Sequence, residues 1–220
     1  MKEILFATSN VSKIKRFELG LNKNNIKILS PKDLNIDIDV NENGKDAIEN
    51  ARIKARAYYD LTHITTIAMD DNLYIEGIPF DKQPGMFVRR VNGKRLDDNE
   101  MIEHYTNLVK MYGKNGKLTA RWVYGMVLIK DGKEYTYTWS KEDFYLVEKP
   151  SAIVNIGYPL NSISVNKKLN KYFTDITQKD KEIITQTEDD VIEFITNNAW
   201  FRRYYSNTWD IYYNIVRLEL

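Results

Sequence analysis

The sequence predicts an α/β fold with two lobes. A strand, a helix and a second strand follow one another at the start of the chain, and two adjacent aspartates come directly after a later apolar strand. Farther on, two long segments rich in β-branched and aromatic residues flank Asp131-Gly132, a pair typical of hairpin turns. We expect this long hairpin to form much of the second lobe.

The opening unit consists of a strand over residues 2–7, a helix over 11–22 and a strand over 26–29. Apolar residues recur within the predicted helix at the spacing of one helix face. They are Val11, Ile14, Phe17 and Leu21. The change of pattern from strand to helix and back is what indicates the α/β class.

Small polar residues and a lysine lie between the first strand and this helix. Thr8, Ser9 and Asn10 are residue types that cap a helix, and a capped N-terminus leaves backbone N–H groups and the positive dipole end facing an anion. Lys13, one turn into the helix, could reach the same anion. The segment suggests a phosphate site, although a helix cap without a ligand explains the same residues.

A second candidate lies on a long helix predicted over residues 46–59, after a polar, acidic loop. Asn50 and Lys54 are four residues apart and therefore share a helix face, and Glu49 is adjacent to them. A carboxylate, an amide and an ammonium group could then project into one cleft. A solvated helix surface is the alternative.

Asp70 and Asp71 follow a strand predicted over residues 64–69, which we expect to end at this pair. Open α/β sheets bind ligands at the C-terminal ends of their strands. Adjacent carboxylates repel each other unless a cation or hydrogen bonds compensate, and oxygen ligands favour Mg²⁺ or Mn²⁺. A carboxylate here could also activate a water that attacks phosphorus. An acidic loop that faces water is the alternative.

An irregular loop over residues 78–94 leads into a helix predicted over 96–112. Within this loop, Arg89 and Arg90 follow Pro84-Gly85. Guanidinium groups suit phosphate oxygens and can stabilise charge that develops on a leaving pyrophosphate. Surface arginines are common, so the pair gains weight only together with the other candidates.

The hairpin strands are predicted over residues 117–129 and 134–147. The chain then continues with a turn at residues 157–159, a helix start near Asn166 and a helix over 187–198. These later predictions depend on shorter and weaker patterns than those of the first half.

Aromatic residues crowd the end of the chain, from about residue 200 to 220. We expect this extension to pack on its own lobe or to form a dimer contact, and the alternative is a platform for a ligand. Because no repeat or low-complexity linker interrupts the sequence, residues 1–220 are expected to form a single two-lobed domain.

The composition argues against several classes of function. With 32 basic and 31 acidic residues the formal charge is +1, which gives no field to attract nucleic acid or an anionic membrane. The absence of cysteine excludes disulfides, thiolate zinc sites and a cysteine nucleophile, and His63 and His104 are too few for most histidine relays. No apolar run approaches the roughly 20 residues of a membrane span, and the N-terminus lacks a signal-peptide core. We expect a soluble, cytoplasmic protein.

In their order and spacing, the four candidates resemble the inosine triphosphate pyrophosphatase family, whose members hydrolyse deaminated purine nucleoside triphosphates to the monophosphate and pyrophosphate. The family motif T-x-N-x-x-K corresponds to residues 8–13, and E-N-A-x-x-K-A corresponds to 49–55. A-D-D-S-G-L is represented by residues 69–74, and P-G-x-x-x-x-R by 84–90. The resemblance covers residues 2–95 well. It implies a mixed, strongly twisted sheet, two lobes with the substrate in the cleft between them, and a homodimer.

The resemblance also implies roles for single residues. Those that would hold the triphosphate are Thr8, Asn10, Lys13 and Lys54. Glu49 and Asp71 would hold Mg²⁺, and Asp71 would activate the attacking water. Arg90, or its neighbour Arg89, would contact phosphate.

The second half of the chain departs from the family pattern. Where the family has G-F-G-Y-D-P, residues 155–160 lack the stacking phenylalanine and the aspartate, and Tyr158 is the ring that remains to stack on a base. The later family lysine corresponds to Lys181, and the S-H-R triplet that reads the keto oxygen of the base falls at residues 185–187. Gln186 would offer an amide there that both donates and accepts. We therefore hypothesise a pyrophosphatase with altered or relaxed base preference.

Two other interpretations stay open. A relative of the family that binds nucleotides or a partner protein without turnover would explain the altered base residues. A hydrolase of a different modified nucleotide would use the same phosphate chemistry. The survival of the lysines and carboxylates argues against the first, because a site without turnover does not need them together.

Overall fold

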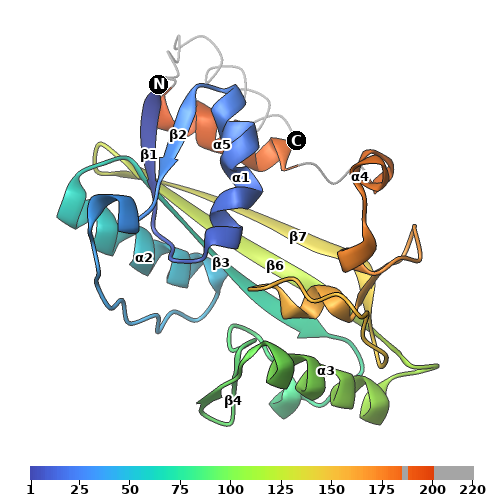
Figure 1. Ribbon diagram of the computed structural model, residues 1–220. Coiled ribbons are helices and arrows are strands. Elements are labelled where there is room, and N and C mark those ends of the chain that lie inside the picture. Colours follow the sequence, from blue (N-terminus) through green and yellow to red (C-terminus); the bar gives the residue numbers. More distant parts are fainter. Residues whose placement is uncertain (185–187, 201–220) are drawn as a thin grey trace, which may run out of the picture.

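A six-stranded mixed sheet forms the centre of the computed structural model, which describes residues 1–184 and 188–200. The strands of the sheet, in the spatial order β2-β1-β3-β6-β7-β8, are β2 (Ile26–Leu29), β1 (Lys2–Phe6), β3 (Thr66–Ile75), β6 (Lys117–Lys130), β7 (Lys133–Val147) and β8 (Ser164–Asn166). β1 is parallel to β2 and β3, whereas β3-β6, β6-β7 and β7-β8 are antiparallel pairs. The predicted α/β class with a mixed sheet and flanking helices is confirmed (Figure 1).

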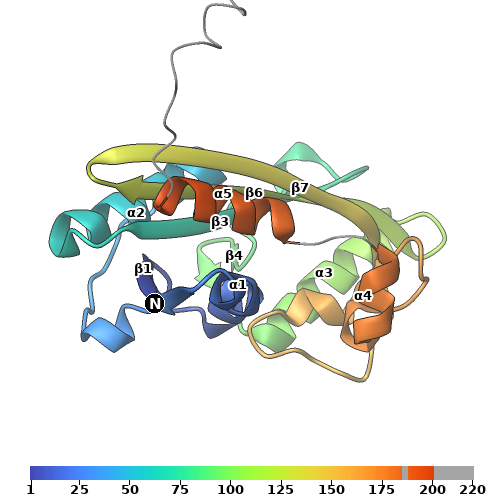
Figure 2. The ribbon, with the colours of Figure 1, turned by 90° about the horizontal axis from the view of Figure 1, so that it is seen from above.

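Helices cover both faces of this sheet. They are α1 (Val11–Lys23), α2 (Ala47–Thr62), α3 (Asp98–Tyr112), α4 (Gln178–Ile184) and α5 (Asp189–Ala199). Alternate residues of β3 face opposite sides, so that Ile67 and Met69 pack with α1 and α5 while Ala68 packs with α2. Figure 2 shows α3 and α4 at the far end of the molecule from α2. Within residues 1–184 and 188–200, no helix is long and apolar enough to cross a membrane.

The strand-helix-strand opening is confirmed almost to the residue. Asn10 caps α1, and Phe17 and Leu21 are buried on its inner face. α5 lies directly against α1 at Gly20, where an added Cβ would stand 2.1 Å from the side chain of Ile192. This close contact keeps α1 on the sheet with its first turn at the edge where β1 ends.

The long hairpin belongs to both lobes, so the prediction that it forms much of the second lobe is only half right. Met126 and Leu128 of β6 pack into the core beneath α1 and α5, whereas Leu118 and Phe144 pack into a second core beneath α3. β6 pairs with β3 from Thr66 to Ile75 of that strand, which continues the central sheet into the second lobe. An irregularity between Ala120 and Trp122 shifts the register of the hairpin where the lobes meet.

β3 does not end at the two aspartates, which corrects the predicted boundary at residue 69. It continues to Ile75, with Asp70 opposite Gly125 and Asp71 opposite Tyr124 on β6. On its other side, β3 pairs with β1 only at Thr66 and Ile67. β3 therefore has a short open edge beyond the end of β1, and the two aspartates lie on it.

The helix start predicted near Asn166 is wrong, because Asn166 ends β8 and begins a tight reversal. Its side-chain oxygen accepts hydrogen bonds from the backbone amides of Lys168 and Leu169. The backbone amide of Asn166 donates to the carbonyl of Lys171. An asparagine of this kind starts a turn as readily as a helix. The predicted helix over 187–198 is present as α5. The aromatic extension beyond Trp200 and the segment 185–187 lie outside the described residues.

Candidate active site

A cleft of about 1050 Å³ lies between the lobes and gathers most of the predicted site residues. Those that line it are Thr8, Ser9, Asn10, Lys13, Lys54, Asp70, Asp71, Arg89, Arg90 and Tyr158. They come from the start of α1, from α2, from the open edge of β3 and from two loops of the second lobe. The structure thus brings the predicted phosphate, acid and arginine motifs into one space.

The loop before α1 offers unpaired amides to this cleft. The side chain of Asn10 accepts from the amide of Ser12 at 2.9 Å, and the hydroxyl of Thr8 accepts from the amide of Asn10 at 3.1 Å. Within the described part of the chain, the amides of Ser9 and Val11 have no acceptor. These amides and the positive end of α1 form an environment that suits an anion.

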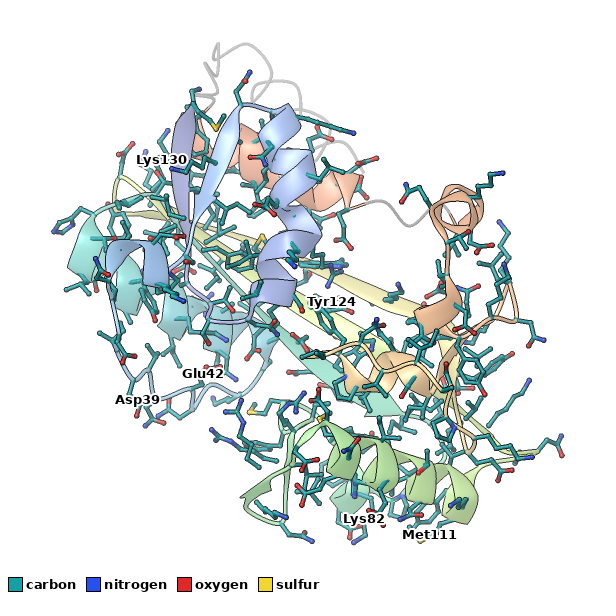
Figure 3. The ribbon with its side chains drawn as sticks, viewed as in Figure 1. Asp39, Glu42, Lys82, Met111, Tyr124 and Lys130 are labelled. Carbon is teal, nitrogen blue, oxygen red and sulfur yellow. The ribbon has the colours of Figure 1, made fainter. Side chains whose placement is uncertain are left out.

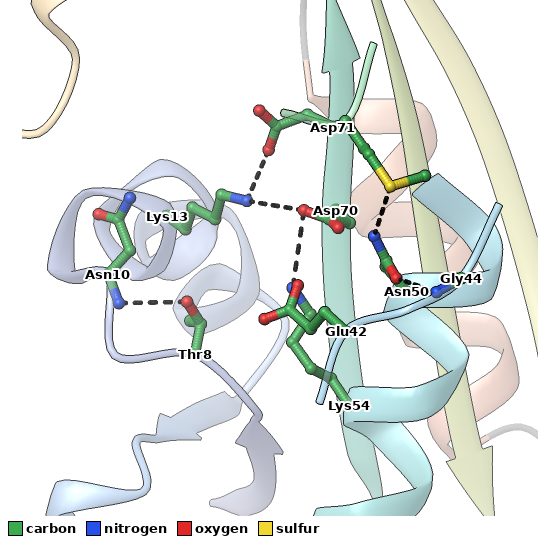
Figure 4. Close-up of polar contacts among 10 residues, drawn as sticks. Thr8, Asn10, Lys13, Glu42, Gly44, Asn50, Lys54, Asp70 and Asp71 are labelled. Carbon is green, nitrogen blue, oxygen red and sulfur yellow. Dashed lines mark hydrogen bonds and ion pairs between the residues drawn. The ribbon is translucent and has the colours of Figure 1, made fainter. Parts of the chain in front are cut away.

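Two lysines and the two aspartates of β3 form the charged centre of the cleft (Figure 4). Lys13 Nζ lies 2.5 Å from Asp71 Oδ1 and 3.9 Å from Asp70 Oδ1, and Lys54 Nζ lies 3.6 Å from Asp70 Oδ1. Burial works against the charge of Lys13, but Asp71 and Asp70 outweigh it and raise the pKa of this lysine. Lys13 is therefore a stable cation at neutral pH.

Gly125 lets α2 reach this centre. A Cβ at Gly125 would stand 2.6 Å from the amide nitrogen of Ile48, in the first turn of α2. Because Gly125 is opposite Asp70 across the sheet, α2 begins directly against the strand position that carries the acid. The side chain of Lys54 therefore extends from α2 to Asp70.

Glu42, which the sequence patterns did not reveal, also lines the cleft. Its carboxylate accepts from Lys54 Nζ at 2.9 Å, and its loop is fixed to α2 by a 2.8 Å hydrogen bond from the amide of Gly44 to Asn50 Oδ1. Figure 3 shows Glu42 in the loop before α2 and Tyr124 beside the first turns of α1. Glu49, in contrast, accepts from the amide of Lys45 and is not among the residues that line the cleft.

The carboxylates of the cleft fit a divalent metal. Burial raises the pKa of Asp70, against the lowering effect of Lys54 and Lys13, and both ammonium groups are too far for hydrogen bonds. No described residue donates a hydrogen bond to the carboxylate of Asp70, so its charge is compensated only by the two more distant ammonium groups. Among residues 1–184 and 188–200, no three acidic or histidine side chains are close enough to form a complete metal site. Mg²⁺ typically uses one or two carboxylates together with substrate phosphates, which suits the adjacent Asp70 and Asp71.

The two predicted arginines differ in their surroundings. Arg89 donates to Asp98 Oδ1 at 2.8 Å and to the carbonyl of Leu96 at 3.3 Å, so it joins its loop to the start of α3. Arg90 lies in β4 (Arg90–Val91), where it is paired with Arg95 of β5 (Lys94–Arg95). Both Arg90 and Arg95 line the cleft, and neither has a carboxylate partner in the described chain. Opposed like charges of this kind are unfavourable without an anion.

The residues predicted to read the base are only partly described. Tyr158 lines the cleft, but its hydroxyl is buried and has no hydrogen-bond partner within the described residues. Ile156, at the position of the family phenylalanine, is 88% exposed. Lys181 lies in α4, and Gln186 lies outside the described residues. Their roles stay predictions.

Arg16 is a further residue of the cleft that the sequence patterns missed. Its guanidinium lies 4.6 Å from the ring centre of Tyr124 and donates to Glu188 Oε1 at 2.8 Å. Burial opposes its charge, whereas Tyr124 and Glu188 raise its pKa. A single arginine on a helix carries no periodic signal, so only the fold reveals these contacts.

Residues 4–189 match the model of the Ham1 family. The chain is 27% identical to the dITP/XTP pyrophosphatase of Bacillus subtilis (strain 168) over 189 residues, which cover 86% of this chain and 93% of that protein. It is 28% identical to the dITP/XTP pyrophosphatase of Clostridium perfringens (strain 13 / Type A) over 190 residues, which cover 84% of this chain and 91% of that protein. The Staphylococcus aureus Ham1 protein has a similar fold, with a TM-score of 0.68 and 21% identity over 90% of this chain and 100% of that one.

Proposed function

Because the chain belongs to the Ham1 family, we infer that it hydrolyses nucleoside triphosphates to a nucleoside monophosphate and pyrophosphate. The observation that carries this inference is the meeting of Lys13 and Lys54 with Asp70 and Asp71 beside the open amides before α1. Ammonium groups and helix N-terminal amides bind phosphate oxygens. A carboxylate among them can orient and deprotonate the attacking water.

In the reaction we propose, a water oxygen forms a bond to the α-phosphorus while the bond from that phosphorus to the oxygen bridging to the β-phosphate breaks. Asp71 accepts the proton of the water, and pyrophosphate leaves with the bond electrons. Lys13 is close enough to Asp71 to hold its carboxylate in place, and the phosphates of the substrate would compete for the same ammonium group. Arg90 suits the negative charge that develops on the departing pyrophosphate.

We propose that the reaction depends on Mg²⁺, with Mn²⁺ as a substitute. Asp71 and Asp70 would hold the metal together with the substrate phosphates, and Glu49 stays a candidate from the sequence. When bound, the metal neutralises phosphate charge and polarises the phosphorus centre. The poorly compensated carboxylate of Asp70 supports this proposal.

We also propose that base recognition differs from that of the named dITP/XTP pyrophosphatases. The loop with Ile156 presents an aliphatic side chain where the family resemblance implies a phenylalanine. Without that ring and without the family's histidine and arginine donors, hypoxanthine and xanthine lose their special contacts. Selection among purine bases should therefore be weak.

The test is pyrophosphate release by the purified protein with Mg²⁺ from the triphosphates of inosine, xanthosine, guanosine and modified nucleosides. Asp71→Asn should reduce kcat by at least about 10²-fold with unchanged folding, since general base catalysis contributes that much or more. Asp81→Asn, at an exposed position outside the cleft, is the matched control. If none of these substrates releases pyrophosphate, the proposed hydrolytic activity is wrong. Nucleotide binding in calorimetry without pyrophosphate release would favour a nucleotide-binding protein instead.

A further inference from the structure

A column of five neighbouring aromatic rings lies on the sheet beneath α5 and ends in the cleft. Neighbouring ring centres are 5.2, 5.8, 4.9 and 6.3 Å apart. In order, the rings belong to Phe194, Tyr137, Trp139, Tyr124 and Trp122. The column is built from α5, β7 and β6, so its rings are fixed by regular secondary structure rather than by a loop.

Trp122 is the last ring of this column and lines the cleft. The ring is half-buried and packs against the cores of both lobes, while its plane lies 24° from that of Tyr124. Tyr124, behind it, is only 8% exposed. Trp122 is therefore a half-buried ring that is held between the two cores, with Tyr124 as its neighbour in the column and with the cleft beside it.

The position of Trp122 suits the base of a nucleotide whose phosphates lie at Lys13. Asp71 pairs with Tyr124, and Trp122 lies two residues farther along β6, which is about 7 Å along the strand. A ribose spans a gap of this order. The phosphate-binding lysine at Asp71 and the indole of Trp122 are therefore separated along the cleft by about the length of a sugar.

We propose that Trp122 is the platform on which the nucleobase stacks, so that the site binds the aromatic face of the base instead of reading its hydrogen-bonding edge. This inference rests on the proposed function. It also explains how the chain dispenses with the loop phenylalanine, since Ile156 has no ring to offer. Every base has an aromatic face, so stacking of this kind tolerates different bases. The ligand class is a nucleotide with any planar base, with purines favoured by their larger face.

Binding of inosine monophosphate and of ribose 5-phosphate, which differ by the base, tests this without requiring turnover. Titration calorimetry should show that the wild type binds the nucleotide about 5- to 100-fold more tightly than the sugar phosphate, in line with the worth of one stacked base. Trp122→Leu, which keeps an apolar side chain but no ring, should lose most of this ratio. Trp122→Phe should restore much of it, and affinity for ribose 5-phosphate should stay the same in all three.

Tryptophan fluorescence gives an independent reading. The chain has four tryptophans, and the emission of Trp122 is the difference between wild type and Trp122→Phe. Inosine monophosphate should quench this difference signal, whereas ribose 5-phosphate should not. Trp139→Phe, in the same column but not among the cleft-lining residues, controls for a general loosening of the column and should keep the binding ratio.

The outcomes separate this inference from the proposed function. If Trp122→Leu is folded by circular dichroism and keeps the wild-type ratio of the two affinities, Trp122 is not the platform, whatever the enzyme hydrolyses. If the ratio of the two affinities falls in Trp122→Leu while the wild type releases no pyrophosphate, base stacking on Trp122 is supported and the proposed hydrolysis is not. An equal loss of affinity for both ligands would assign Trp122 a structural role only and overturn the proposal.

Discussion

At the scale of single residues, Asp70 and Glu42 both approach the ammonium group of Lys54, at 3.6 and 2.9 Å. The aspartate pair was recognisable because adjacent acids after an apolar strand are unusual, and the structure places both in the cleft. Glu42 lies in a loop without periodicity and approaches Lys54 only because the fold returns that loop to α2. Contacts between residues that no repeating pattern connects can be found only from the packed chain.

The charge of Asp70 should reduce the stability of the folded protein. Burial raises the pKa of this carboxyl above its value in the unfolded chain, so the ionised form is disfavoured on folding at neutral pH. That destabilisation is present above the folded pKa and fades as the pH falls to about 4, near the unfolded value. We expect Asp70→Asn to raise the melting temperature at pH 7.5 and to change it little at pH 4.

Scanning calorimetry at both pH values measures this difference. Asp131→Asn is the matched control, because this exposed turn position has a φ of 50°, which asparagine also adopts. A melting temperature of Asp70→Asn that is lower than the wild type at pH 7.5 would show that the lysines compensate Asp70 fully.

At the scale of elements, the helices were predicted best where local signals agree. α1 and α2 begin at side-chain caps and carry apolar residues at helical spacing, so their limits were predicted within a few residues. The predicted end of β3 comes too early, because aspartate is rare inside strands. The rest of β3 is stabilised by pairing with β6, which is distant in sequence. The helix start predicted near Asn166 is wrong because an asparagine fits both a helix cap and a turn.

Gly125 should be required for the contact between α2 and β6. Its added Cβ would meet backbone atoms of Ala47 and Ile48, which cannot move like the end of a flexible side chain. We expect Gly125→Ala to lower the free energy of unfolding by about 1–3 kcal/mol, as overpacking typically does. Urea denaturation measures the change.

Thr138→Ala is the control, because Thr138 is the exposed neighbour of Gly125 on β7. Its effect should stay within about 0.5 kcal/mol. Equal stability of Gly125→Ala and the wild type would mean that α2 can shift away from the strand.

The hairpin of β4 and β5 should contribute to phosphate binding through two arginines. Arg90 and Arg95 face each other without a carboxylate, so an anion in the cleft would relieve their repulsion. We expect Arg95→Gln to raise KM for a nucleoside triphosphate about 3- to 10-fold, in line with the net worth of one ordinary hydrogen bond, and to weaken the dependence of KM on salt.

Arg121→Gln, at an exposed position that does not line the cleft, should leave both quantities unchanged. Steady-state kinetics at two salt concentrations measure KM and its salt dependence for each variant. The same KM in Arg95→Gln and wild type would mean that Arg95 does not contribute to phosphate binding.

At the scale of the whole molecule, the sequence predicted the α/β class and the cleft, and it missed how the lobes are joined. β6 and β7 run through both cores, so the lobes share a continuous sheet rather than being linked by a flexible segment. Sequence patterns show that two strands form a hairpin, but not how far each one extends beside β3. That depends on the sum of the packing interactions.

The homodimer stays a prediction at this scale, and so does the role of the aromatic extension. Light scattering of the purified protein should give twice the monomer mass of 25.9 kDa. A chain that ends at Trp200 should lose either the dimer or several degrees of melting temperature, because large aromatic side chains favour buried contacts. Unchanged mass, stability and activity of the shortened chain would contradict this.

The early end of β1 has a consequence beyond catalysis. It leaves a few residues of β3 without a neighbouring strand on the side away from β6, between the pairing at Ile67 and the contact of Leu73 with Gly85. An unpaired edge can recruit a strand from another molecule, and natural proteins discourage this with charged residues at the edge. Asp70 and Asp71, with the lysines that approach them, place charge at this gap. We expect the residues that prepare the cleft for a phosphate chain also to disfavour strand pairing with another molecule at the same opening.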